Sequence, residues 1–231
     1  MSGRRRIRVL GTAAMCMAAV IAAACSGAAR AATPATRQDA LALPTPRLNS
    51  NVSLEAALAT RRSVRSFADV ALSWEEIGQL LWAAQGITSE WGARSAPSAG
   101  ALYPLEVYVS TATGVYHYVP QGHQAVSTLD ADMREDLWVA GLKQDAVRQA
   151  PAVFVIAAVY DRTSGKYGDR AARYVQLEAG HAAQNVLLQA VALGLGGVPI
   201  GAFDDAKVQA VLGLPEDQKP LYLIPVGYPE E

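Results

Sequence analysis

The sequence has 231 residues, of which 51% are hydrophobic and 18% charged, and 20 Lys and Arg against 21 Asp and Glu leave a formal net charge of −1. This balance excludes a general nucleic-acid or acidic-surface binder, and the apolar content excludes a largely disordered chain. The length allows one domain, or at most two, with a sizeable core. Because its only two cysteines, Cys16 and Cys25, lie near the N-terminus, disulfides, thiolate–zinc sites and a cysteine nucleophile are excluded elsewhere. No two of the three histidines have metal-ligand spacing along a helix, so no metal site is expected.

Residues 1–31 have the pattern of an export signal. Four arginines within the first eight residues precede an apolar run over 9–24, and Ala29-Arg30-Ala31 is an A-x-A cleavage pattern. The apolar run is shorter than the roughly twenty residues of a spanning helix, which disfavours a membrane anchor. Ala22-Ala23-Ala24-Cys25 resembles a bacterial lipobox without its usual leucine, in which case the signal ends at residue 24 and Cys25 is acylated. The arginines also leave twin-arginine export open.

The predicted location follows from this signal. We expect an exported bacterial protein, either periplasmic or a membrane-anchored lipoprotein, with no transmembrane domain in the mature chain. Residues 32–51 contain three prolines and no apolar period, which predicts a linker. The folded domain is expected to span 52–231.

The first half of this domain begins with two predicted helices. Ser53 is a plausible N-cap for a helix starting at residue 54. Ser73 and Glu76 form a capping box before a helical stripe that Gly86 ends. Residues 107–110 and 115–119 are rich in β-formers on either side of Thr113-Gly114, which predicts a hairpin.

The second half contains the longest regular elements. Residues 152–159 are an unbroken apolar run, typical of a central strand buried on both faces. A long, mostly apolar helix is predicted over 175–193, with Gly194 as its cap, and a last strand over 221–226. The predicted fold class is α+β, with helices packed around a largely antiparallel sheet.

Three loops carry residues suited to binding a ligand. The basic segment, Arg61-Arg62-Ser63-Val64-Arg65, offers guanidinium forks and a hydroxyl that suit a phosphate; alone it could equally be a solvated turn. The small-residue loop, residues 96–104, would let backbone approach a flat ligand. The glycine segment, residues 194–201, follows a helix rather than a strand and lacks dinucleotide or P-loop spacing, which disfavours a Rossmann fold or an NTPase.

Taken together, these segments resemble the nitroreductase-like flavin family, specifically its azoline-dehydrogenase branch, which forms thiazoles and oxazoles. The resemblance covers nearly everything from residue 54 to residue 227. It rests on five ordered blocks: RRSVRSF at 61–67, LLWAAQGI at 80–87, APSAGALYPLEVYV at 96–109, KYGDRAARYVQLEAGHAAQN at 166–185 and ALGLGGVPIGAF at 192–203.

The resemblance implies FMN bound at the interface of an intertwined homodimer, with residues of both subunits completing each site. In this arrangement the basic segment would hold the phosphate, the ribityl chain and the pyrimidine edge of FMN. The small-residue loop would lie along the isoalloxazine ring, and the middle of the long helix would approach the reactive N5 side of that ring. The glycine segment would make a backbone contact near the ring and its tail. The residues implied are Arg61, Arg62, Ser63 and Arg65, then Pro97, Ser98, Ala99 and Gly100, then Glu178, Ala179 and Gly180, and finally Leu195, Gly196 and Gly197.

The chain departs from the family pattern in two places. Ala101 and Tyr103 stand where many nitroreductases have Asn and Gln, a form that the azoline branch shares. Family members often grip the phosphate with a basic residue after the last strand, whereas here residues 227–231 contain none. This departure leaves two alternatives: a lower affinity for phosphate, or substitution by another cation such as Lys207.

Lys166 and Tyr167 match a Lys-Tyr pair that azoline dehydrogenases use for removing a substrate proton. The resemblance therefore implies a catalytic pair in which the lysine acts as base and the phenol assists. The alternative is that Lys166 caps an exposed loop while Tyr167 packs at the dimer interface.

Two classes of function remain at this point. The first is an FMN-dependent oxidoreductase, working on a small molecule either as an azoline dehydrogenase or as a quinone or nitro reductase. The second is a protein that binds a flavin or small heterocycle and has lost turnover.

Overall fold

The computed structural model describes residues 40–230. The predicted export signal and the first part of the predicted linker lie outside the described residues. Between residues 40 and 230, no helix combines the length and the apolar character that crossing a membrane requires.

The centre of the fold is one seven-stranded sheet with the order β1-β4-β3-β2-β5-β7-β6, and every pair of neighbouring strands is antiparallel. The predicted α+β class is therefore confirmed. The strands are β1 (Ala40–Ala42), β2 (Leu105–Thr111), β3 (Gly114–Val119), β4 (Gln124–Leu129), β5 (Ala152–Val159), β6 (Gly196–Gly197) and β7 (Gln218–Gly227).

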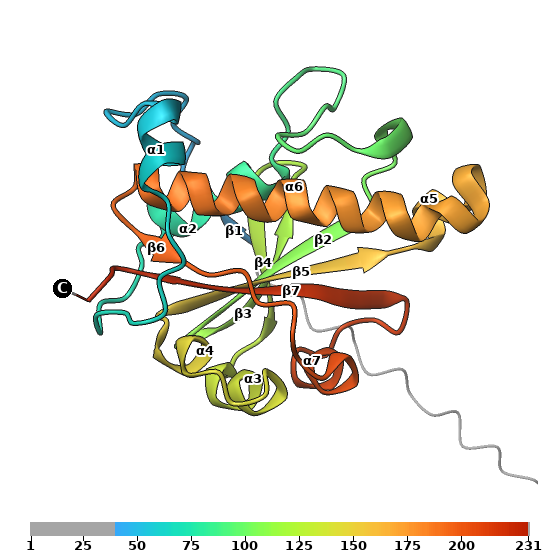
Figure 1. Ribbon diagram of the computed structural model, residues 1–231. Helices are drawn as coiled ribbons and strands as arrows, with labels where there is room; N and C mark the ends of the chain where they lie inside the picture. The colour runs from blue at the N-terminus through green and yellow to red at the C-terminus, as the bar shows by residue number, and fades with distance from the viewer. Residues whose placement is uncertain (1–39, 231) are drawn as a thin grey trace, which may run out of the picture. The chain divides into compact units, whose positions relative to one another are not determined.

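Helices cover both faces of the sheet. In Figure 1, α1, α2 and α6 lie above the sheet, and α3, α4 and α7 lie below it. The helices are α1 (Leu54–Thr60), α2 (Trp74–Gln85), α3 (Arg134–Ala140), α4 (Asp145–Gln149), α5 (Asp161–Tyr167), α6 (Ala171–Ala192) and α7 (Asp205–Val211), with short 3-10 turns at Ala99–Ala101 (η1) and Gly168–Arg170 (η2).

Strand β5 divides the core into two halves. All eight of its residues are buried, as expected for a strand between two helical layers. Because successive side chains point to opposite faces, Phe154 and Ile156 pack on the α2 and α6 side, while Val153 and Val155 pack on the α3, α4 and α7 side.

Local sequence signals are confirmed at several element ends. Ser53 Oγ accepts from Ala56 N at 3.1 Å, and the reciprocal capping box of Ser73 and Glu76 is complete. Gly194, with φ 75°, follows the end of α6. Helix α6 begins at Ala171, four residues before the predicted start. Its first turn consists of two alanines, an arginine and a tyrosine, so the sequence there shows no clear apolar period.

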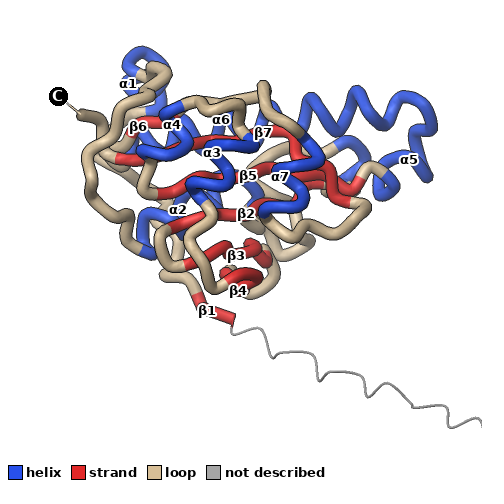
Figure 2. The backbone as a smooth tube through the Cα atoms, turned by 90° about the horizontal axis from the view of Figure 1, so that it is seen from below, coloured by secondary structure: helices blue, strands red, loops and turns tan. Residues whose placement is uncertain are grey.

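Part of the expected linker belongs to the sheet. Ala40–Ala42 pair with β4 as the edge strand β1, and Figure 2 shows this strand at the margin of the sheet. The next residue, Leu43, is buried and donates its N–H to His123 O at 3.0 Å. A three-residue strand is too short to show alternation in the sequence, so only its pairing partner reveals it.

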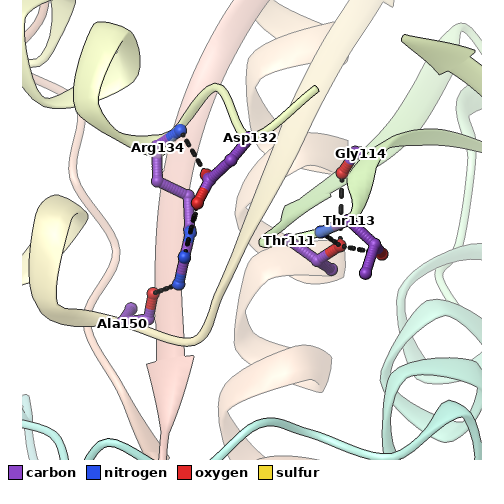
Figure 3. A network of polar contacts seen from close by, with 6 residues as sticks. All are labelled: Thr111, Thr113, Gly114, Asp132, Arg134 and Ala150. Carbon is purple, nitrogen blue, oxygen red and sulfur yellow. Dashed lines mark hydrogen bonds and ion pairs between the residues drawn. The ribbon is translucent and has the colours of Figure 1, made fainter. Parts of the chain in front are cut away.

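Two small polar networks fix turns beside the sheet (Figure 3). At the predicted hairpin, Thr111 Oγ1 accepts from Thr113 N at 3.2 Å and donates to Gly114 O at 3.3 Å. Before α3, Arg134 binds Asp132 through Nε and Nη2 and donates to Ala150 O at 3.2 Å. These contacts satisfy backbone groups that neither helix nor strand engages.

Candidate functional site

The basic segment is held against the glycine segment. Ser63 forms a parallel bridge with Gly197, and Val64 N donates to Gly197 O at 3.1 Å. A Cβ on Gly196 would lie 2.5 Å from Val64 Cγ2, and one on Gly197 would lie 2.9 Å from Pro225 O. These two positions therefore require glycine for the segments to approach so closely.

The residues after β7 hold the basic segment from its other end. Ala68 N donates to Tyr228 O at 2.9 Å, and Glu230 N donates to Ser66 O at 3.2 Å. Residues 63–68 are thus fixed by two segments that are far away in the sequence. The backbone that carries the arginines is ordered by the protein itself.

The three arginines of the basic segment have different surroundings. The Arg62 guanidinium donates to Ala59 O and Arg61 O, at 3.0 and 2.8 Å, and so caps the end of α1. Arg61 is partly exposed and Arg65 is exposed, and neither takes part in any ion pair found within residues 40–230. Arg61 and Arg65 therefore present charges that an anionic ligand can engage.

The small-residue loop has an unusual backbone. Gly100, Ala101 and Tyr103 all have positive φ, at 64°, 55° and 47°. Ser98 Oγ accepts from Tyr103 N at 2.9 Å and closes the bend. Left-handed conformations at alanine and tyrosine are disfavoured, and such strain clusters at functional sites.

Lys166 and Tyr167 lie against this loop. A Cβ on Gly100 would lie 2.8 Å from Lys166 Nζ and 2.9 Å from Tyr167 OH. Lys166 is exposed, and its Nζ lies 5.5 Å from the centre of the Tyr167 ring. Both predicted catalytic groups therefore meet the loop that was predicted to lie along a flat ligand.

Glu178 lies on the buried side of α6. Only 2% of the residue is exposed, and its Oε1 makes no hydrogen bond among the described residues. Burial raises the pKa of Glu178 to about 7, while Ser98, Arg94 and Gln85 partly offset this rise. Ser98 and Gln85 face the carboxyl without reaching good hydrogen-bond geometry.

The two residues after Glu178 differ in their surroundings. Ala179 is buried in the core, whereas a Cβ on Gly180 would meet nothing within 4 Å. His181, the next residue, is exposed. At Gly180 the surface of α6 is therefore bare backbone, which a flat molecule can approach closely.

Helix α6 connects the predicted segments. It packs against α1, which leads into the basic segment, against η1 in the small-residue loop and against β6 in the glycine segment. Within residues 40–230, no hydrogen bond or ion pair joins the arginines of the basic segment directly to the small-residue loop. Lys207, considered as a substitute phosphate ligand, pairs with Asp204 at 3.0 Å on α7, on the opposite face of the sheet.

A polar cluster behind the loop was not anticipated. Glu106 pairs with Arg162, and its other carboxylate oxygen lies 2.6 Å from His117 Nε2. Burial alone would raise the pKa of Glu106, but the hydrogen bond with His117 and the Arg162 charge hold it below its ordinary value. The available sequence signal was one carboxylate, Glu106, inside an otherwise apolar strand.

Comparison with known proteins shows what the chain is related to. The model of the "Nitroreductase family" matches residues 58–228. A "Putative nitroreductase" of Methanocaldococcus jannaschii is 46% identical over 182 residues, which cover 76% of this chain and 91% of that protein. The chain belongs to the nitroreductase family.

Two further relatives of this nitroreductase-family chain are informative. A crystal structure of a "putative nitroreductase" from Ralstonia eutropha has a TM-score of 0.77 and 30% identity, covering 83% of this chain and 90% of that one. A microcin B17-processing protein of Escherichia coli is 27% identical over 133 residues, 52% of this chain and 48% of that protein. The nitroreductase-like fold is thus shown, and with it membership of a family of flavin oxidoreductases.

Proposed function

We propose that this nitroreductase-family protein is an FMN-dependent oxidoreductase that removes hydrogen from a small ring compound of the azoline type, or alternatively one that reduces quinones or nitro compounds. The observation that carries the proposal is the contact of Lys166 Nζ and Tyr167 OH with the small-residue loop at Gly100. A base and a phenol thereby face the loop along which the flavin ring is proposed to lie.

The described residues fit FMN in charge and shape. Arg61 and Arg65, which lack carboxylate partners in the described chain, and Ser63 would hold the phosphate end. The bare backbone at Gly180 and the small side chains at residues 97–100 leave room for a planar ring. Proteins of this family typically bind FMN, which supplies two-electron redox chemistry when bound.

Lys166 and Tyr167 have distinct roles in this proposal. Dehydrogenation of a ring releases one hydrogen as a proton, and Lys166 Nζ would accept it. The Tyr167 hydroxyl would donate a hydrogen bond and orient the substrate. The exposure of Lys166 lets the accepted proton pass to solvent.

The homodimer is part of the proposal. Leu54 and Leu58 on α1 and Leu177 on α6 are 62%, 53% and 52% exposed. Large apolar side chains exposed on neighbouring helices favour burial against another protein surface. A second copy of the chain would cover them and complete each site.

An exported location would favour the dehydrogenase direction. The nicotinamide donors of most nitro and quinone reductases are cytoplasmic. A protein with the predicted export signal, whether periplasmic or anchored through Cys25, would need another electron partner.

The second candidate is a binding protein that keeps the fold without turnover. Glu230 lies beside the basic segment through its hydrogen bond to Ser66 O, in a region where family members often have a basic residue. An acidic group there lowers the expected affinity for phosphate.

Spectroscopy and turnover separate the two candidates. The purified protein should be yellow, carry FMN and elute as a dimer in light-scattering chromatography. Anaerobic photoreduction followed by addition of quinones, nitroarenes and other acceptors should then reoxidise the flavin. A colourless monomer that takes up no FMN in titration would contradict both the cofactor and the dimer. A yellow dimer that no acceptor or substrate affects would favour the binding protein.

A further inference from the structure

A cavity of about 330 Å³ lies beside the polar cluster of Glu106, His117 and Arg162. Its polar wall consists of Gln85, Arg94, Glu106, His117 and Arg162. Its other wall is apolar and includes Val119 and Pro120, and Gln121 stands exposed at its edge. The volume is within the range of small-molecule sites.

The charge of Arg94 is not compensated in this cavity. Arg94 Nη1 donates to Gln85 Oε1 at 3.0 Å, and the guanidinium stacks 4.5 Å from the centre of the Tyr103 ring. No carboxylate lies within ion-pair distance of it among residues 40–230. Arginines that are half-buried in proteins normally pair with an anion.

The nearby carboxylates do not supply that partner. Glu106 is engaged by Arg162 on one oxygen and by His117 on the other. Glu178 acts on Arg94 only from a distance, and its pKa of about 7 leaves it largely uncharged in slightly acidic solution.

Gln85 orients Arg94 without neutralising it. Gln85 is 1% exposed, its Oε1 accepts from Arg94 Nη1, and its amide group faces the Glu178 carboxyl. The polar wall therefore has a surplus positive charge on Arg94.

We propose that this cavity binds a small organic monocarboxylate, with its carboxylate on the Arg94 guanidinium and its apolar body against Val119 and Pro120. A monoanion fits better than a phosphate, because the adjacent Glu106 would repel a second negative charge. No cavity residue belongs to the proposed flavin site, so this inference stands apart from the proposed function.

An occupant would also touch the framework of the small-residue loop. Arg94 stacks on Tyr103, and Arg162 Nη1 donates to Tyr103 O at 3.1 Å. The carboxylate would therefore bind near a loop that also meets Lys166 and Tyr167.

Isothermal titration of the purified protein, with the cofactor that it carries, tests the site. Benzoate is the probe, and neutral benzamide and inorganic phosphate are the comparisons. We expect benzoate to bind once per chain, with benzamide and phosphate at least about tenfold weaker, because both the charge and the apolar body contribute. Arg94→Gln should reduce benzoate affinity about tenfold or more. No benzoate binding at millimolar concentration, or equal binding of benzamide, would overturn the proposal.

A second set of variants avoids the buried wall and keeps the test valid if Arg94→Gln fails to fold. Gln121 is exposed at the cavity edge, so Gln121→Glu should weaken benzoate binding several-fold and Gln121→Lys should strengthen it. Gln149→Glu, on exposed α4 across the sheet, is the matched control and should leave affinity unchanged. Equal affinities for the Gln121 variants and this control would place the benzoate elsewhere and overturn the site.

Discussion

The two helical layers of this fold bury different kinds of side chain. The buried residues of α3, α4 and α7 are all alanine, valine or leucine. Helices α2 and α6 on the opposite face bury Gln79, Gln85 and Glu178 as well as apolar groups. Buried polar groups lower the free energy of unfolding unless they are fully paired. The α6 layer is therefore less stabilising at the place where the candidate site lies. In the α3, α4 and α7 layer, the one buried polar side-chain atom without a hydrogen bond among the described residues is Trp138 Nε1.

The largest expected effect is on the rate of catalysis, and it comes from a residue on the α6 side of the sheet. Lys166→Ala should slow dehydrogenation of a thiazoline- or oxazoline-containing peptide by about 10²–10⁴-fold, because a general base acts in the transition state. Flavin content and dimer formation should not change. Stopped-flow absorbance of flavin reduction measures the rate, and Lys143→Ala, on the other layer, is the control. Unchanged rates in both Lys166→Ala and Tyr167→Phe would remove the pair from the mechanism.

A substitution in the α3, α4 and α7 layer should change the stability of the protein and not its affinity for FMN. Leu137 on α3 is fully buried, so Leu137→Ala should lower the free energy of unfolding by about 3 kcal/mol through lost packing and a residual cavity. FMN affinity of the folded protein should stay the same. Urea unfolding measures the first quantity and fluorescence titration the second, with exposed Leu142→Ala as a near-neutral control. A large loss of FMN affinity in the folded Leu137→Ala protein would break the proposed division between the layers.

Glu178 gives the α6 layer a dependence on pH. Its folded pKa of about 7 lies above the ordinary 4.5, so the native state binds the proton more tightly than the unfolded state does. Its contribution is therefore complete below pH 4.5 and is lost as the pH rises through 7, by up to about 3 kcal/mol. Glu178→Gln should remove this loss, which urea unfolding of the flavin-free protein at pH 5 and pH 8.5 would show. Parallel stability curves for the two proteins would mean that the carboxyl is not desolvated.

The smallest effect concerns the exposed arginines. Arg61→Ala or Arg65→Ala should weaken FMN binding tenfold or more, since a charge-assisted phosphate contact contributes about 1.5–3 kcal/mol. Arg148→Ala is a suitable control because this residue pairs with Asp145 and stacks on Trp138 in the other layer. Arg94 is unsuitable, since it lies in the polar cluster behind the loop. The same FMN dissociation constant for all three variants would identify the basic segment as a solvated turn.

Sequence patterns predicted the elements whose information is local. The capping box at Ser73, the hairpin at Thr113-Gly114 and the apolar strand over 152–159 each depend on neighbouring residues only. The pairing of Ser63 with Gly197 and of Ala40–Ala42 with β4 depends on residues far away along the chain. No periodicity in either partner indicates such a contact.

The sequence predicted the separate segments of the candidate site but not the contacts between them. Resemblance to the family indicated Lys166 and the small-residue loop, but their contact at Gly100 needed the backbone turn with φ 64°. The Arg94 and Glu106 cluster was missed because single charged residues in apolar segments have no characteristic spacing. Their shared environment exists only once β2, β3 and α5 have packed together.

The pairing of residues 63–68 with Gly197, Tyr228 and Glu230 sets an order of events during biosynthesis. The basic segment emerges from the ribosome early, yet Tyr228 and Glu230, which hold the residues directly after it, are translated only after β7. A nascent chain that lacks these two residues has to order residues 66–68 when it meets a ligand, and this ordering costs conformational entropy. Binding of the proposed FMN is therefore expected at the end of translation rather than at its beginning.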